Sequence, residues 1–232
     1  MIDGQLFPLF EIETVWNSRA DFVLAEIRQA IIQLRLRPGD RLSEAEVARQ
    51  FGVSRQPVRE AFIKLAQARL LSVRPQRGTL VRLISRQDVE NAHFVREAIE
   101  IAAVRKAAER ADEHAIQGLR DLVAKLALAP ANDHGKFMGM DEAFHEAIAQ
   151  SGGTAHAWRI LEGLKAQLDR VRFLAIDDVT PVAAIVAEHG AIVDAIERRS
   201  PQEAEDRMRA HMAEILVSLP RLVEAHSELF SD

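Results

Sequence analysis

The sequence predicts a mainly α-helical protein with two domains, and three observations lead to this prediction. Apolar residues recur at helical spacing over most of the 232 residues, and strand patterns are confined to about 71–83. The charge also changes sign along the chain. Residues 18–83 contain 13 Lys and Arg against 6 Asp and Glu, a balance of +7, whereas residues 84–232 contain 17 against 26, a balance of −9. A basic domain therefore precedes an acidic one.

The composition excludes several classes of protein. No stretch approaches the roughly 18 uninterrupted apolar residues of a membrane span, and the first residues lack the basic leader of a secretion signal. We therefore expect a soluble, cytoplasmic protein without a membrane partner. The sequence contains no cysteine, which excludes disulfides, thiolate metal sites and cysteine nucleophiles.

The basic domain begins with three predicted helices. Apolar residues at helical spacing, interrupted by Pro and Gly, place these helices at about 19–35, 43–50 and 54–69. Ser43 and Glu46 have the spacing of a capping box at the start of the second helix. Ser54 is a favourable N-cap for the third helix, which follows after a short turn. Two short helices joined in this way are typical of a helix-turn-helix.

A β-hairpin follows the third helix, and after it the strand signal disappears. Two short strands, 71–74 and 80–83, flank a polar turn. Three helices and a hairpin form a winged helix-turn-helix, to which we assign 18–84, while 1–17 stays unassigned. We assign 85–232 to an antiparallel all-helical bundle, with helices predicted at about 86–110, 112–128, 134–150, 154–175, 180–199 and 201–226.

Seven residues of the basic domain are candidates for contacts with double-stranded DNA. If the third helix enters a major groove, its first two turns can read base edges, and its N-cap serine can meet a phosphate. In the hairpin, arginines and a glycine would let the backbone approach a phosphate or a minor groove. The alternative is an ordinary solvated face. The candidates are Ser54, Arg55, Gln56 and Arg59 in the helix and Arg74, Arg77 and Gly78 in the hairpin.

Four polar residues of the acidic domain lie on helix faces that are otherwise apolar: Asp141, His145, His189 and His211. A buried carboxylate and buried imidazoles need partners, and one divalent metal would satisfy all four. Three neutral nitrogens and one carboxylate suit zinc, and also nickel or manganese. For each histidine taken alone, the alternative is a hydrogen-bonded core residue.

The basic domain resembles the GntR family of regulators. The resemblance covers about 18–83 and rests on the runs PGDRLSE at 38–44, FGVSRQPVREA at 51–61 and RGTLV at 77–81. It implies an operator on double-stranded DNA as the partner, with contacts at Ser54, Arg55, Arg59 and Gly78.

The acidic domain resembles the FCD ligand-binding domain, which characterises the FadR subfamily of GntR regulators. This second resemblance covers about 90–220 and rests on DEAFH at 141–145, Glu188-His189 and MRAHM at 208–212. It implies that a small carboxylate completes the coordination of a metal held by Asp141, His145, His189 and His211.

The FCD resemblance also implies an arginine near the effector. The matching residue in the first helix of the domain is Arg96, for which the alternative is a surface salt bridge to Glu100 at helical spacing. Arg172 is a second candidate for the effector site.

These observations predict a transcriptional regulator and not an enzyme. We expect a repressor of a catabolic operon that a small carboxylate or sugar acid modulates near the metal. Because a helix-turn-helix protein commonly reads two half-sites, we expect a homodimer. One alternative is a metal-dependent hydrolase with Glu142 or Glu188 as the base. Another is a DNA-binding regulator whose metal is purely structural.

Overall fold

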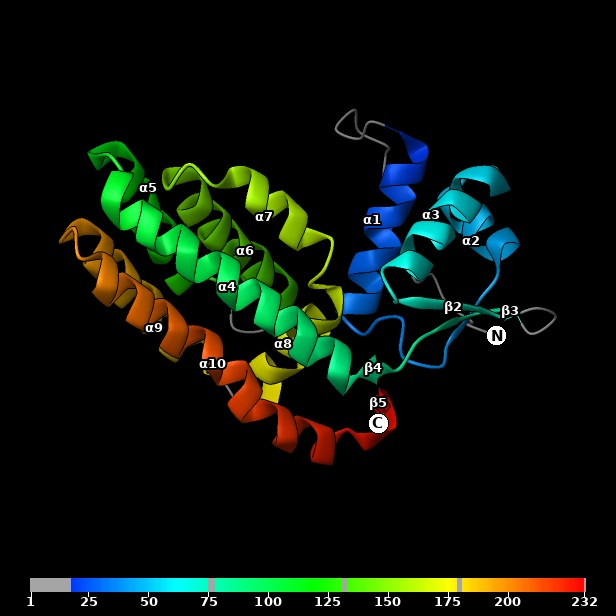
Figure 1. The fold of residues 1–232 in the computed structure, drawn as a ribbon. Coiled ribbons are helices and arrows are strands. Elements are labelled where there is room, and N and C mark those ends of the chain that lie inside the picture. The colour runs from blue at the N-terminus through cyan, green and yellow to red at the C-terminus, as the bar shows by residue number, and fades with distance from the viewer. Residues whose placement is uncertain (1–17, 75–77, 131–132, 179–180, 232) are drawn as a thin grey trace. The chain divides into compact units, whose positions relative to one another are not determined.

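The computed structural model describes residues 18–74, 78–130, 133–178 and 181–231, and Figure 1 shows their helices and strands. The chain divides into two compact units. One unit ends at Arg86 and also takes in the C-terminal residues from Glu228, and the other is Gln87–Ser227. In the described residues, none of the helices has the length and the apolar character needed to span a lipid bilayer.

Three helices and a three-stranded antiparallel sheet build the first unit. The helices are α1 (Arg19–Ile32), α2 (Glu44–Phe51) and α3 (Arg55–Gln67). The strands lie in the order β1-β3-β2, with bounds Arg41–Leu42, Gly78–Val81 and Leu71–Arg74. Helix α3 packs against α1, α2 and β2. This is the predicted winged helix-turn-helix, and β2 and β3 form its hairpin (Figure 1).

Local sequence explains where the helices of this unit begin and end. The Ser18 side chain accepts a hydrogen bond from the backbone of the first turn of α1. Gly52 ends α2 with a φ of 62°, which glycine adopts without strain. The predicted capping box is wrong. Ser43 is the N-cap of α2 but its side chain makes no capping hydrogen bond, and Glu46 accepts instead from Arg49 at 2.7 Å.

Two strand assignments differ from the prediction. The second hairpin strand is Gly78–Val81 rather than 80–83, because β3 pairs with β2 through the glycine itself, which lies opposite Arg74. A separate parallel ladder joins β4 (Ile84–Ser85) to β5 (Phe230–Ser231), with Ile84 opposite Phe230. Both of these side chains are buried. The apolar packing of two residues so distant in sequence left no periodic signal that could have predicted it.

In the described residues, the second unit contains seven α-helices, whose buried apolar side chains form a main core and a smaller cluster beside Trp158. The helices are α4 (Arg86–Arg110), α5 (Glu113–Ala127), α6 (His134–Ser151), α7 (Ala155–Glu162), α8 (Ala166–Asp178), α9 (Val182–Glu197) and α10 (Pro201–Ala225). Helix α5 packs against α6 and α9, and α10 packs against α8 and α9. The main core includes fully buried side chains from α4, α6, α9 and α10, among them Val104, Phe144, Ile192 and Met208.

The single helix predicted for 154–175 is wrong, because the chain forms two helices there. Gly163 ends α7, and α8 begins three residues later. The bend puts α8 against both α6 and α10. Gly152 marks another close approach, where α6 ends: a Cβ at this position would lie 2.8 Å from the Ala103 carbonyl oxygen of α4. The absence of a side chain at Gly152 therefore lets these two helices meet.

Candidate functional site

Helix α3 presents the predicted base-reading side chains to solvent. Arg55, Gln56 and Arg59 are exposed on its first two turns. Arg59 contacts Glu44 of α2 at 3.2 Å, and both side chains are partly open to solvent. Such an exposed pair contributes only about 0–1 kcal/mol, so the pairing leaves Arg59 available for another anion.

Ser54 and the hairpin offer groups suited to the DNA backbone. Ser54 is the exposed N-cap of α3, and its hydroxyl makes no capping hydrogen bond. Gly78 opens β3 with a φ of 84°, where a side chain would strain the backbone. Arg77 and the side chain of Arg74 lie outside the described residues, so the basic hairpin tip stays a prediction.

The four predicted metal ligands come together in the second unit. Asp141 and His145 lie on α6, His189 on α9 and His211 on α10, and one ligand atom from each lies within 4.8 Å of the others. His189 Nε2 is 3.4 Å from His211 Nε2 and 3.4 Å from Asp141 Oδ1. Two donors bound to one tetrahedral zinc at about 2.1 Å would lie about 3.4 Å apart. The donor set therefore fits a single divalent cation.

Two carboxylates outside the cluster of four residues contact Nδ1 of two of its imidazole rings. Glu188 Oε2 lies 2.7 Å from His211 Nδ1. The buried Glu100 contacts His145 Nδ1. Because both contacts use Nδ1, they leave Nε2 of each ring for the centre of the cluster. His145 Nε2 is buried without a hydrogen-bond partner. An orphaned nitrogen at this place is an independent sign that the cluster is suited to a cation.

Burial controls the protonation of the cluster. It lowers the pKa of His189 well below its ordinary value, and it lowers the pKa of His211. Both rings are therefore neutral at pH 7 and keep a lone pair for a metal. Burial alone would raise the pKa of Asp141, but Arg172 and the nearby imidazoles hold that pKa far below its ordinary range. Asp141 is therefore ionised and has the charge state that a metal ligand needs.

Arg172 of α8 neutralises carboxylates at the edge of the cluster. Its guanidinium forms ion pairs with Asp141, with Glu142 at 2.5 Å and with Asp169 at 3.2 Å. Glu142 also meets Lys165 at 2.7 Å. Burial acts to raise the pKa of Glu142, but the two cations lower it to about 2. The guanidinium of Arg172 is thus already matched by protein carboxylates.

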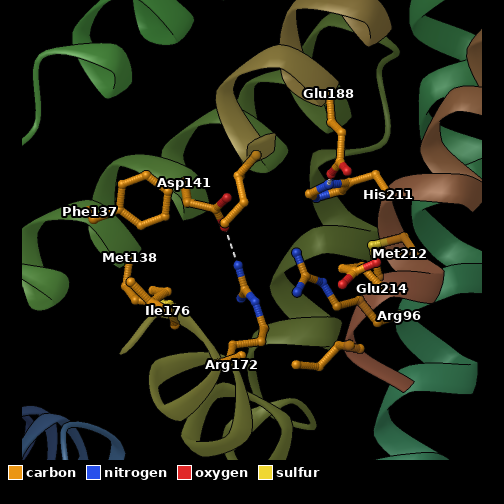
Figure 2. A pocket seen from close by; sticks show the side chains of 13 residues that line it. Arg96, Phe137, Met138, Asp141, Arg172, Ile176, Glu188, His211, Met212 and Glu214 are labelled. Atoms are coloured by element: carbon orange, nitrogen blue, oxygen red, sulfur yellow. Dashed lines mark hydrogen bonds and ion pairs between the residues drawn. The ribbon is translucent and has the colours of Figure 1, made fainter. Parts of the chain in front are cut away.

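A pocket of about 70 Å³ lies beside the cluster (Figure 2). Its wall includes Asp141 and His211 of the cluster, both arginines predicted for the effector, and apolar side chains of α6, α8, α9 and α10. Arg96 is 2% exposed and its Nη2 has no hydrogen-bond partner. A buried guanidinium nitrogen on a pocket wall is suited to a ligand oxygen.

The alternative interpretation of Arg96, a surface salt bridge to Glu100, is wrong in its location. The pair exists, with Arg96 Nε donating to Glu100 Oε1 at 2.5 Å, but both side chains are buried. The same carboxylate contacts His145 through its other oxygen. Glu100 therefore links Arg96 on the pocket wall to the predicted metal ligand His145.

The sequence did not predict that Glu100 and Glu188 contact rings of the cluster. It suggested Glu100 only as a salt-bridge partner of Arg96 at helical spacing, and Glu188 only as the base of a hydrolase. Their contacts with His145 and His211 join different helices, so helical spacing does not reveal them. The available signal was weak: Glu188 directly precedes His189, and Glu100 lies about one helical turn after Arg96.

Comparisons with known proteins agree with this two-part organisation. The model of bacterial regulatory proteins of the gntR family matches residues 19–81, and the FCD domain model matches residues 79–214. The chain is 38% identical over 207 residues to the HTH-type transcriptional repressor RspR of Escherichia coli (strain K12), covering 89% of this chain and 91% of that protein. It is 32% identical to a probable D-xylose utilization operon transcriptional repressor of Paenarthrobacter nicotinovorans, covering 88% of each.

The fold of this chain is also similar to that of a solved structure. E. coli McbR/YncC matches with a TM-score of 0.74 at 20% identity, covering 89% of this chain and 99% of that one. The hydrolase alternative is wrong, because the matching family and the named relatives are transcriptional regulators and not enzymes. The chain belongs to the GntR family of bacterial regulatory proteins, in the FadR subfamily that carries an FCD domain, and it is a DNA-binding transcriptional regulator.

Proposed function

We propose that this regulator is a homodimeric repressor of a catabolic operon, modulated by a small carboxylate that binds beside a divalent metal. One observation carries the proposal: three imidazole nitrogens and one carboxylate converge at the wall of a pocket that also holds an unpaired nitrogen of Arg96. Both named relatives are called repressors, and one is named for a utilization operon. Such a protein would act in the cytoplasm, where its operator lies.

Zinc is the first choice for the metal. The separations of 3.4 Å at His189 agree with tetrahedral zinc. Neutral imidazoles and one ionised carboxylate also suit nickel and manganese, which add further oxygen ligands more readily. When bound, the cation would supply a positive centre that attracts an anionic ligand into the pocket.

Arg96 is a better candidate than Arg172 for contact with the effector. Arg172 already pairs with three carboxylates, whereas Arg96 pairs with Glu100 and keeps Nη2 unpaired. A carboxylate ligand would complete the hydrogen bonding of this nitrogen at little cost in reorganisation. Because Glu100 also contacts His145, occupancy of the pocket and of the metal cluster would affect each other.

The DNA-binding part of the proposal rests on α3. Arg55 and Gln56 stand exposed at its N-terminal end, where a major groove would receive them. Two copies of the helix reading two half-sites would account for a homodimer. Effector binding then needs a coupling free energy of only about 1–3 kcal/mol to weaken operator binding by about 5- to 150-fold.

Fluorescence anisotropy with a labelled DNA fragment from upstream of the regulator's own gene tests this function. We expect binding in the presence of zinc, and release by at least one member of a panel of two- to six-carbon carboxylates. Release should disappear in Arg96→Gln and persist in Arg110→Gln, a change at an exposed position of the same helix. Operator binding that no carboxylate alters, with or without metal, would contradict the proposal. Light scattering on the same sample gives the oligomeric state.

A further inference from the structure

Strand β5 belongs to the DNA-binding unit, although it follows α10 of the second unit in the chain. The first unit ends at Arg86 and takes in the residues from Glu228, so β4 and β5 both lie within it. The two strands pair in parallel, with Ile84 opposite Phe230 (Figure 1). Ile84 is fully buried and Phe230 is 8% exposed. The DNA-binding unit therefore includes a buried aromatic side chain from beyond the effector-binding helices.

The β4–β5 ladder joins the ends of two helices that line the pocket. Helix α4 begins directly after β4 and places Arg96 on the pocket wall. Helix α10 places His211 and Met212 on that wall, and residues 226–229 connect its end to β5. Strand β4 in turn follows β3 of the wing after residues 82–83. Two helices of the pocket wall are therefore connected to the same pair of strands, one of which comes directly after the wing.

Within the second unit, two interactions hold α10 to α4. His93 of α4 is buried, and its Nε2 donates a hydrogen bond to the backbone carbonyl of Met212 at 2.7 Å. Glu97 of α4 forms an ion pair with Arg209 at 3.3 Å. His211 lies between these two positions of α10 in the sequence. A metal bound to His211 would therefore act on α10 at the place where α10 is held to α4.

The ladder depends on an ordered α10. Each of its strands has two residues, and so short a pair of strands is marginal in water by itself. Because the linker 226–229 is short, an ordered α10 keeps β5 at a high effective concentration beside β4. This concentration falls when the end of α10 unfolds and the linker becomes longer. A ligand that stabilises α10 therefore also stabilises the ladder.

We propose that β5 transmits the occupancy of the metal cluster and the pocket to the wing of the DNA-binding unit. The inference rests on the proposed metal and effector for its signal, and on the β4–β5 ladder for its route. A cation on His211 stabilises α10, the ordered α10 keeps Phe230 opposite Ile84, and the paired β4 restrains β3, which begins at Gly78. Loosening of α10 has the opposite result and gives β3 more freedom.

Hydrogen exchange of the full chain, with and without one equivalent of zinc, tests this route. In the wild type we expect zinc to slow exchange in α9 and, by about fivefold or more, in residues 78–85, since fivefold is the lower end of the usual range for coupled sites. Phe230→Ala should keep the slowing in α9 and reduce the slowing in 78–85 to less than about twofold. Glu228→Ala is the matched control, because Glu228 is exposed in the same segment, and it should behave as the wild type.

A disulfide across the ladder separates loss of the β4–β5 contact from a general weakening of the fold by Phe230→Ala. The chain has no cysteine, and Ser85 lies opposite Ser231 in the ladder. Neighbouring strands are close enough for a disulfide to join them. When Phe230→Ala is combined with Ser85→Cys and Ser231→Cys, oxidation should restore the zinc-dependent slowing in 78–85. Reduction followed by alkylation of the thiols should abolish it again.

The results that would overturn this inference differ in what they say of the proposed function. If zinc slows exchange in α9 but not in 78–85 of the wild type, or slows 78–85 equally in Phe230→Ala, the metal site stands and the route through β5 is wrong. The route is also wrong if the disulfide forms and restores nothing. If zinc slows exchange in neither region, the proposed metal site is wrong, and this inference fails with it.

Discussion

The two functional regions of this regulator hold their polar side chains in opposite ways. Helix α3 carries Arg55 and Arg59 on one exposed face, where pairing with other residues is weak or absent. The proposed metal cluster gathers groups from α6, α9 and α10, of which Asp141, His145 and His189 are buried, and Glu100 and Glu188 contact two of its rings from outside. Groups in water can change partner at little cost, whereas buried groups are costly unless every partner is present. Changes in α3 should therefore affect binding alone, and changes in the cluster should affect metal, effector and stability together.

Loss of a cluster ligand should have the largest effect. His189→Gln removes a buried imidazole nitrogen that lies 3.4 Å from two other ligand atoms. At a zinc concentration about 1,000 times the dissociation constant, the metal stabilises the wild-type protein by about 4 kcal/mol. We expect the His189→Gln variant to lose this metal-dependent part of the free energy of unfolding. The measurement is urea unfolding with and without a chelator.

His114→Gln is the control for this change, because His114 is an exposed histidine of α5. It should keep the full difference between the zinc-loaded and chelated protein. Equal stabilisation by zinc in His189→Gln and in the wild type would remove His189 from the metal site.

A supporting carboxylate should matter less than a ligand. Glu188→Gln keeps the size of the side chain but weakens the contact with His211 Nδ1, which lies 2.7 Å from Glu188 Oε2. Changes of this kind typically cost about 10- to 100-fold in metal affinity. Competition with a fluorescent zinc chelator measures the affinity. An affinity within twofold of the wild type would show that His211 does not depend on Glu188 for its orientation.

The same contrast explains what the sequence could predict. The residues Asp141, His145, His189 and His211 were identifiable because each interrupts an apolar stripe on its own helix. Helix α3 was predictable because the turn before it, its N-cap and its first arginines lie within a few residues of one another. The contacts of Glu100 and Glu188 depend on how separate helices pack, which periodicity does not encode.

The errors in the predicted fold have the same origin. The break between α7 and α8 at Gly163 falls within a stretch whose apolar spacing continues without interruption. The pairing of Ile84 with Phe230 joins two-residue strands, too short for a period-two pattern. In both places tertiary packing decides the local structure, and the apolar spacing alone does not reveal it.

Within α3, Arg55 should affect DNA binding and leave stability unchanged. It is exposed, and no residue of the described chain forms an ion pair with it. Arg55→Ala should weaken operator binding by about 1–3 kcal/mol, the range for one bidentate contact with a base. Anisotropy titrations at several salt concentrations provide the measurement, with thermal unfolding as a check on the fold. Arg49→Ala, an exposed change on α2, is the comparison. Equal losses of operator affinity for the two variants would show that Arg55 acts through its charge and not through a contact with a base.

The smallest effect should come from the partner of Arg59. Glu44 meets Arg59 at 3.2 Å in an exposed pair, so Glu44→Gln should change the free energy of unfolding by less than about 1 kcal/mol. It should also raise operator affinity two- to fivefold, because Arg59 no longer leaves a carboxylate to reach DNA.

Glu46→Gln on the same helix is the control. It removes an equal charge, but from a residue that pairs with Arg49. It therefore measures the effect of the charge change alone, without the release of Arg59. If both variants raise affinity equally, the Glu44–Arg59 pair has no specific role. A gain confined to Glu44→Gln would show that an exposed ion pair restrains a reading side chain without supporting the fold, in contrast to the buried pairs of the metal cluster.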